Sequence, residues 1–394
     1  MAKKIRGRNE GSIYQRSNGG WRVQISVNGK RLNKSFDRKS DAQEWLHKTK
    51  YQLDKGYDVE GGRITLKEYL KKWLESYKIT IRPKTYHRYK GLTEKHIIPH
   101  LGDIQLRNLQ PLRIEGFYSQ LLVNGLSSRS TRHVHSVLHR ALEKAVGYGL
   151  LLRNPASCVN LPQYKPAEMQ IWNENQVSVF LMTAHESTHK ALYHLAVTTG
   201  MRQGEIFGLQ WSDLNLENGK LNVKRQVQHI PGEGWSFAEP KTRSGRRSIQ
   251  LGEGTIIVLR DHYQSQQIRK AANADRWQEY GLIFPSSVGT PLNASNLRLD
   301  FNRIIKEAEL PKIRFHDLRH TAASLMLNHG VPLIVVSRML GHAKASITLD
   351  IYGHLIHEMQ DEAARVMDEL VTPIPVLIPQ NEPIVTSKNA VNLG

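Results

Sequence analysis

Two stretches that resist regular structure divide this chain and limit what it can fold into. The first lies near residues 56–64 and is rich in glycine, and the second runs from Asn154 to Pro166 and holds three prolines. Glycine and proline favour turns and exposed connections over the interiors of helices and strands. A chain of 394 residues also exceeds the ~100–200 residues of an ordinary domain. We therefore predict several folded parts and no single common core.

The charge of the chain indicates its partner. Lys and Arg total 55 against 36 Asp and Glu, a formal charge of +19, and residues 1–50 alone hold 13 basic and four acidic residues. Such an excess favours a polyanion, with nucleic acid ahead of a membrane surface. The single cysteine, Cys158, excludes an intrachain disulfide and a cysteine-rich metal site. Because no apolar run nears the ~18–20 residues of a membrane span and polar residues follow the basic start, we expect a soluble intracellular protein.

Residues 1–60 predict a small sheet covered by a helix. In residues 21–27 apolar side chains alternate with polar ones, the period of a half-buried strand, and turn sequences flank the segment. The pattern predicts three strands and then a helix opening at Ser40. Arg22 and Gln24 would lie on the face away from the helix, where they suit contacts with phosphates and base edges. A solvated basic face is the alternative.

Residues 64–160 predict a mostly helical second part. Thr65 and Glu68 form a capping-box signature at its start. Apolar residues then recur at helical spacing, and do so again at 117–122. The prolines that separate the predicted helices are Pro83, Pro99 and Pro111. The basic helical residues that could line a DNA backbone, or simply keep the helix surfaces solvated, include Lys84, Arg88, Arg129 and Arg132.

Residues 170–371 predict a third part in which helices are mixed with a small antiparallel sheet. Three segments alternate as antiparallel strands do: 220–224, 235–238 and 246–251. Residues 372–394 combine prolines with aliphatic residues and few charges, which predicts an extended or disordered tail. The expected fold class is multidomain α+β: a three-stranded sheet plus helix, a helical domain, and a mixed, mainly helical domain.

An arginine stands between two predicted helices of the third part. One apolar helix ends at Gly200 and the next begins near Arg202. The junction would hold the guanidinium in a fixed place. An ordinary ion pair between Arg202 and Glu205 at helical spacing is the alternative.

Further along, nitrogen-bearing side chains converge on one predicted helix. His316, Arg319 and His320 share a helical face. A metal site is not expected there, because a pair of histidines needs further ligands and an adjacent arginine would repel the cation. His342 follows the next helix, and Tyr352 comes ten residues later.

Five residues in this order resemble the active-site set of the tyrosine recombinase family, of the phage integrase type: Arg202, His316, Arg319, His342 and Tyr352. Lys241, in a basic turn with Arg243, is similar to the strand-turn lysine of that family. The basic first part resembles the arm-site-binding domains of lambda-like and conjugative-transposon integrases. The helical second part resembles their core-site-binding domain. The resemblance covers residues 170–371 through its motifs, and the earlier parts through pattern and position.

The resemblance implies how a phosphodiester would be bound. A phosphate under attack gathers negative charge, and two guanidiniums offer permanently charged, forked donors that match it. Arg202 and Arg319 would take that role, and His342 would hydrogen-bond the phosphate.

The resemblance also implies a covalent step. A phenol with a pKa of ~10 is mostly neutral at pH 7, so Tyr352 would need those cations or a base, for which His316 is the candidate. The tyrosine would become linked to a 3′ phosphate and free a 5′ hydroxyl, with Lys241 donating the proton to the departing oxygen. One ester replaces another, so no ATP, metal or other cofactor is expected.

The function that follows is site-specific recombination of DNA, integrating or excising a mobile element such as a phage. The expected partners are duplex DNA with core and arm attachment sites, a homotetramer formed on DNA, and no membrane; the need for an excisionase or a DNA-bending protein stays open. The expected location is the cytoplasm of a bacterial host, at the nucleoid. The rivals are a type IB topoisomerase, an inactive DNA-binding regulator and an RNA-binding protein. The expected DNA-contacting residues are Arg22, Gln24, Lys84, Arg88, Arg129, Arg132 and Arg243.

Overall fold

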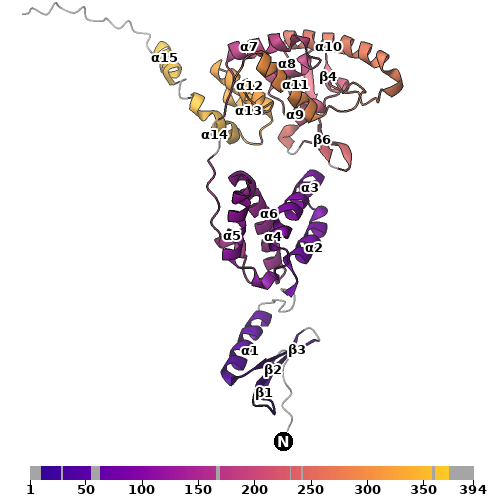
Figure 1. Cartoon of the computed structure of the whole chain (residues 1–394). Helices are drawn as coiled ribbons and strands as arrows, with labels where there is room; N and C mark the ends of the chain where they lie inside the picture. Colours follow the sequence, from indigo (N-terminus) through magenta and orange to yellow (C-terminus); the bar gives the residue numbers. More distant parts are fainter. Residues whose placement is uncertain are drawn as a thin grey trace, which may run out of the picture. The chain divides into compact units, whose positions relative to one another are not determined.

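The computed structural model describes residues 10–27, 30–54, 63–165, 169–230, 232–240, 243–356 and 360–371. Lys241, the predicted tail 372–394 and most of the glycine-rich stretch lie outside these ranges. Helices predominate, with small sheets among them (Figure 1). Within the described ranges no helix is both long and apolar enough to span a bilayer. The chain divides into two compact units, one reaching residue 167 and one made by nearly all later residues.

The first part is the predicted three-stranded sheet with one helix. Its elements are β1 (Ser12–Gln15), β2 (Trp21–Val27), β3 (Lys30–Phe36) and α1 (Lys39–Asp54). The strands are antiparallel in the order β1-β2-β3, and α1 packs on β2 and β3. Val23 and Ile25 are buried, so the alternating Arg22 and Gln24 lie on the other face, where Arg22 pairs with Ser35 in the register. The helix begins one residue before the predicted Ser40.

The helical part contains α2 (Leu66–Lys78), α3 (Pro83–Leu92), α4 (Ile98–Leu101), α5 (Pro111–Val123) and α6 (Ser128–Gly147). The capping box is present: the Thr65 hydroxyl accepts from the Glu68 N–H, and the Glu68 carboxylate accepts from the Thr65 N–H. Leu66, Leu70 and Trp73 enter the core of this part as their spacing predicts. Leu122 does not, being exposed while Leu121 is buried.

Pro99 does not separate two helices, contrary to the prediction. A π-helical turn, Thr93–Ile97, runs directly into α4, and the Ile98 N–H donates to the Thr93 carbonyl. Pro99 therefore stands in the first turn of α4, where a residue needs no N–H to continue the helix.

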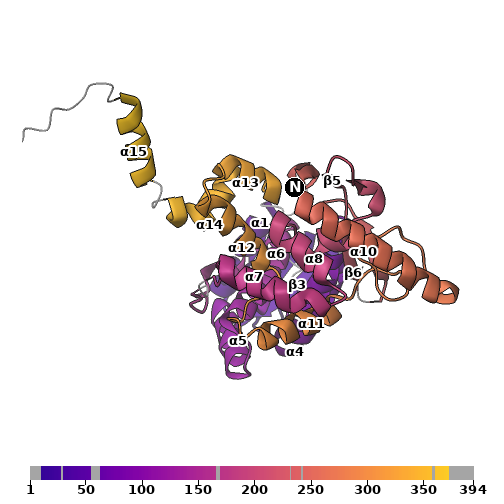
Figure 2. The ribbon, with the colours of Figure 1, turned by 90° about the horizontal axis from the view of Figure 1, so that it is seen from above.

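The later part packs helices around the small strands. Its helices are α7 (Glu174–Thr183), α8 (Lys190–Thr199), α9 (Gln203–Phe207), α10 (Glu253–Ala272), α11 (Ala294–Glu307), α12 (Asp317–Asn328), α13 (Leu333–Leu340), α14 (Ala345–Ile356) and α15 (Gln360–Val371). Helix α8 contacts both α10 and α12 and lies between them in both views (Figures 1 and 2). Its apolar residues, such as Leu192 and Leu195, are buried in the core, because this helix is enclosed on most sides.

All three predicted segments are strands, but they lie in two sheets and not in the single small sheet that was expected. The strands are β4 (Leu214–Asn215), β5 (Lys220–Val223), β6 (Gln226–Ile230), β7 (Gly234–Ala238) and β8 (Arg247–Gln250). β5 and β8 pair in a sheet with β4, whereas β7 pairs with β6 in a separate two-stranded sheet. Alternation predicts that a segment is a strand, but the pairing depends on contacts between distant residues.

Two glycine-terminated helices bring the ends of α8 and α13 together. Both Gly200 and Gly341 adopt left-handed backbone conformations, with φ of 61° and 68°, which end the helices without side-chain strain. A Cβ on Gly200 would lie 2.6 Å from Leu340 Cδ2. Another residue at position 200 would have to displace that side chain and hold a strained backbone conformation. The close approach brings the start of α9 near the residues that follow α13, where Arg202 Nη2 donates to the Gly341 carbonyl at 3.4 Å.

Candidate active site

A single buried carboxylate holds two arginines in the later part. Glu205 is 2% exposed, and its Oε1 accepts from Arg202 Nη1 at 2.8 Å while Oε2 accepts from Arg247 Nη2 at 2.9 Å. Burial by itself would raise the pKa of Glu205, but the hydrogen bond and charge of Arg247, followed by the charge of Arg202, lower it below its usual range. The carboxylate is therefore ionised and fixes both guanidiniums.

Arg247 also belongs to this cluster, although the sequence placed it only in the predicted strand 246–251 and not among the expected site residues. It is the first residue of β8, and it lies two positions before the buried Ile249, on the same face of the strand. Arg247 Nε also donates to the Met339 carbonyl at 2.5 Å, which fastens β8 to the end of α13. An arginine at an inward-facing strand position is the signal that could have identified it.

Arg319 is the most deeply buried arginine of this cluster, with 4% of its surface exposed. Its Nη1 donates to the Gly200 carbonyl at 2.8 Å, whereas Nη2 has no partner among the described residues. Burial, and then the positive charge of Arg202, lower its pKa to about 9. Three guanidiniums thus surround one carboxylate, and a buried N–H of one of them remains available to an anion.

Tyr352 lies beside these arginines on α14. It is 2% exposed and packs with Leu327, Val336 and Leu340 between α12 and α13. Burial raises the pKa of Tyr352 to about 12, while the positive charge of Arg319 acts in the opposite direction. Its Oη is 2.6 Å from His320 Nδ1. Sequence reasoning placed His320 on the right helical face but did not give it this contact, because the bond joins residues 32 positions apart.

The other two predicted histidines, His316 and His342, lie near Arg319. His342 Nδ1 is 2.7 Å from the buried Thr348 hydroxyl, which leaves Nε2 for a further partner. Its pKa is lowered to about 4 by burial, then by the charges of Arg319 and Arg202. His316 is exposed, and its ring stands edge-on to that of His320 with centroids 5.4 Å apart.

The structure therefore brings together the residues predicted from five separate points of the sequence. They are Arg202 before α9, His316 and Arg319 at α12, His342 after α13 and Tyr352 on α14. Lys241, the sixth member, lies outside the described residues. Among the described residues no three His, Cys, Asp or Glu side chains are placed to hold a metal ion.

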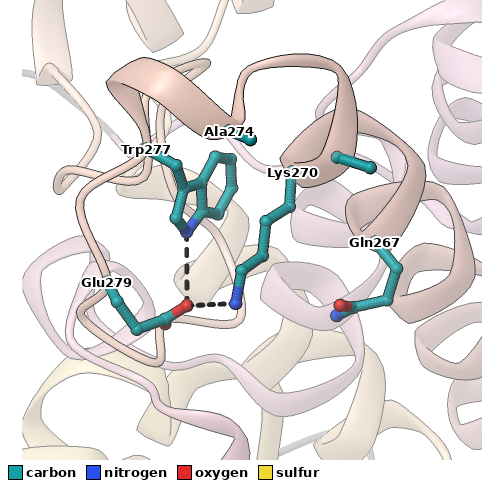
Figure 3. A pocket seen from close by; sticks show the side chains of 6 residues that line it. Gln267, Lys270, Ala274, Trp277 and Glu279 are labelled. Carbon is teal, nitrogen blue, oxygen red and sulfur yellow. Dashed lines mark hydrogen bonds and ion pairs between the residues drawn. The ribbon is translucent and has the colours of Figure 1, made fainter.

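A separate cavity of about 520 Å³ lies at the end of α10 (Figure 3). There the Glu279 carboxylate accepts hydrogen bonds from Lys270 and from the indole of Trp277. No residue of the arginine cluster lines it, so this cavity is distinct from the candidate site.

The basic residues predicted on the helical part are exposed on two adjacent helices. Lys84 and Arg88 lie on α3, and Arg129 and Arg132 on α6. Burial and then the charges of Arg88 and Arg129 lower the pKa of His133, so both arginines lie near one ring. The side chain of Arg243 falls outside what the structure describes.

Replacing Glu205 with glutamine is expected to lower the free energy of unfolding by about 3 kcal/mol, because removing one partner leaves buried charges unpaired. The folded pKa lies below the unfolded one, so this stabilisation is present at neutral pH and is lost as the pH falls through the folded value. Urea unfolding at pH 7 and at pH 4 measures both effects. Glu186, with 94% of its side chain exposed, provides the matched control, and a Glu205→Gln loss below about 1 kcal/mol would contradict the expectation.

Comparisons with known proteins agree with this arrangement. Residues 171–359 match the model of the Phage integrase family, and residues 65–122 match that of the Phage integrase, N-terminal SAM-like domain. The chain is 28% identical to a Tyrosine recombinase XerC-like protein of Caldanaerobacter subterraneus over 94% of this chain and 100% of the relative. It is 24% identical to the ICEBs1 integrase of Bacillus subtilis over 91% and 100% of the two chains.

Two solved structures share the fold. A Tn1549 transposon integrase in complex with transposon right end DNA matches with a TM-score of 0.65 and 22% identity over 78% of this chain and 100% of that one. A lambda integrase tetramer bound to a Holliday junction matches with a TM-score of 0.54 and 19% identity over 87% and 97%. Since the family match spans every helix that carries an arginine or histidine of the site, the chain belongs to the phage integrase family of tyrosine recombinases and is a site-specific recombinase.

Proposed function

We propose that this recombinase cleaves and rejoins duplex DNA through a 3′-phosphotyrosine at Tyr352, to integrate or excise a mobile element such as a phage. The observation that carries the proposal is the excess of positive charge beside this tyrosine. Arg202 and Arg247 share the carboxylate of Glu205, whereas the nearby Arg319 is bonded to the Gly200 carbonyl and its Nη2 has no partner within the described residues. A scissile phosphate would accept from that N–H and balance the charge.

The proposed roles follow from the positions of the side chains. Arg202 and Arg319 donate to the nonbridging oxygens, where charge grows as the phosphorus is attacked. His342, whose lowered pKa keeps it neutral at pH 7, adds a hydrogen bond through Nε2. Lys241 gives a proton to the departing 5′ oxygen. His316 completes the set as one of two histidines, with His320, that could accept the tyrosine proton.

We assign the parts of the chain as follows: arm-site binding to 1–60, core-site binding to 64–160, catalysis to 170–371 and an extended tail to 372–394. Two DNA-binding surfaces on one chain would raise the effective concentration of the second contact without new interactions. The proposed DNA contacts are Arg22, Gln24, Lys84, Arg88, Arg129, Arg132 and Arg243. The DNA in the Tn1549 complex and the lambda tetramer on a Holliday junction support duplex attachment sites and a homotetramer as partners. The proposed location is the cytoplasm of a bacterial host, at its nucleoid.

The test is a nicked duplex that carries the attachment site. Cleavage near the nick releases a short fragment with a free 5′ hydroxyl. This fragment diffuses away, so that rejoining is prevented and the protein stays linked to the DNA. We expect a covalent complex that survives denaturation, with the DNA attached to the peptide containing Tyr352. Two differently marked duplexes should then exchange strands. Resealing of each duplex with its own strand would favour a type IB topoisomerase, no covalent complex would favour a DNA-binding regulator, and preferential competition by RNA would favour an RNA-binding protein.

A further inference from the structure

The tyrosine hydroxyl is hydrogen-bonded to a histidine that the family resemblance did not include, His320. Tyr352 Oη lies 2.6 Å from His320 Nδ1, a normal hydrogen-bond distance. The two residues come from α14 and α12, which pack against each other. His316 is exposed, and its ring stands edge-on to that of His320 without a hydrogen bond from its side chain to any described residue. Of the two histidines, only His320 therefore touches the atom that would attack phosphorus.

The surroundings of His320 keep its ring neutral near pH 7. Burial is the largest effect on its pKa and lowers it, the carboxylate of Asp317 acts in the opposite direction, and the charges of Arg319 and Arg314 lower it further. A neutral ring has one protonated and one unprotonated nitrogen. With the proton on Nε2, the tyrosine hydroxyl donates to Nδ1, so the pair is ready for transfer of that proton.

We infer that His320 is a catalytic residue that accepts the phenolic proton of Tyr352 through Nδ1. The inference rests on the proposed function. As the bond between Oη and phosphorus forms, the proton passes from Oη to Nδ1, the bond between phosphorus and the 5′ oxygen breaks, and the leaving oxygen takes a proton from a separate acid. On rejoining, the 5′ hydroxyl passes its proton to the conjugate base of that acid as it attacks phosphorus, the bond between Oη and phosphorus breaks, and His320 returns its proton to Tyr352. No oxidant, metal or nucleotide enters either direction.

Before a phosphate is attacked, an imidazole cannot remove the proton of this phenol to any extent, because burial raises the pKa of Tyr352 to about 12 and lowers that of His320. The transfer becomes favourable during the reaction, because the proton on the phenolic oxygen becomes far more acidic once that oxygen begins to bond to phosphorus. The base is therefore needed while the new bond forms and not before. This timing agrees with a hydroxyl that stays protonated until a phosphate arrives.

A purely orienting role for His320 makes a different prediction from a proton-accepting role, and one substitution separates them. In His320→Asn, the amide can replace Nδ1 as a hydrogen-bond partner but cannot take a proton at ordinary pH. In His320→Ala, both functions are lost. We expect both variants to form the covalent complex about 100-fold more slowly than wild type, within the range of general-base effects, and His316→Ala to be affected less than either.

A substrate with sulfur in place of the bridging 5′ oxygen provides the second arm. A thiolate leaves without a proton donor because thiols have a pKa of ~8.5, so this substrate should restore a variant that lacks the acid, such as Lys241→Ala. It should leave the defects of His320→Ala and His320→Asn in place. Duplex binding and thermal unfolding are measured for every variant, so that slow cleavage is compared only among folded, DNA-binding proteins.

Near-normal cleavage by His320→Asn would overturn the inference in favour of an orienting hydrogen bond. Cleavage by His320→Ala at or above the wild-type rate would do so in favour of a restraint or a bystander, and rescue of either variant by the sulfur substrate would make His320 the acid. Failure of the proposed function has another signature, since wild type itself would then form no covalent complex dependent on Tyr352. If His320→Ala does not fold, the Asn variant decides alone.

Discussion

Replacing Tyr352 with phenylalanine is expected to eliminate the covalent protein–DNA complex completely. The substitution removes the oxygen that we propose attacks the phosphate and leaves the ring in its place among Leu327, Val336 and Leu340. The free energy of unfolding should change by only about 1 kcal/mol, the usual net worth of one hydrogen bond, because His320 is only partly buried and can bond to water instead. Denaturing gels of the nicked-duplex reaction measure the first effect and urea unfolding the second.

A second tyrosine controls for a general effect of losing a hydroxyl. Tyr263 on α10 is 42% exposed, and its Tyr→Phe variant should cleave and bind like wild type. The Tyr352→Phe protein should still bind duplex DNA, since its arginines are untouched. Covalent complex formation by Tyr352→Phe at any rate near that of wild type would mean that another side chain is the nucleophile.

Replacing Arg319 with methionine is expected to reduce cleavage about 1,000-fold and yet to raise the free energy of unfolding of the DNA-free protein by about 1 kcal/mol. Loss of a preorganised donor to the transition state has a cost of this size in catalysis, ~10²–10³-fold. In the free protein, however, Arg319 is a buried charge near Arg202 and Arg247 with one N–H unsatisfied. A well-packed apolar replacement for such a charge is often neutral or stabilising.

The same variant should lose a response to anions. We expect sulfate to bind the folded wild type through the partly exposed Arg202 beside Arg319, and not the unfolded chain. It should therefore raise the wild-type melting temperature by mass action, and do so much less for Arg319→Met. Arg260→Met is the matched control, because Arg260 is exposed on α10 and donates to the Leu216 carbonyl. A loss of more than about 2 kcal/mol in Arg319→Met would mean that the native fold already compensates the charge.

Local signals in the sequence were sufficient for the ends of helices. The capping box of Thr65 and Glu68 and the helix end at Gly200 both depend on residues within one turn. Each is decided by the need of terminal N–H and C=O groups for nearby partners. The structure confirms the predicted first sheet for a similar reason, since tight turns fix the register of its hairpins.

Contacts between distant residues could not be predicted in the same way. Arg247 bonds Glu205 across 42 positions, and Tyr352 meets His320 across 32. The β7 strand was recognised from its alternation, but its partner was not. The order of the motifs indicated, through a family resemblance, that Arg202, Arg319 and Tyr352 belong together. The physical reason is a buried carboxylate with several guanidiniums near it, and this arrangement could be seen only in the folded structure.

A hydroxyl from which water is almost wholly excluded is equally out of reach of a phosphate, which is the larger group. The 2% exposure of Tyr352 therefore keeps the proposed nucleophile covered in the DNA-free protein, so that we expect chance collisions with DNA to leave it uncut. We expect a duplex to reach the tyrosine only when its binding moves the side chains packed around α14. The free energy needed to expose the Tyr352 hydroxyl should therefore add to the discrimination between DNA sites before any bond is broken.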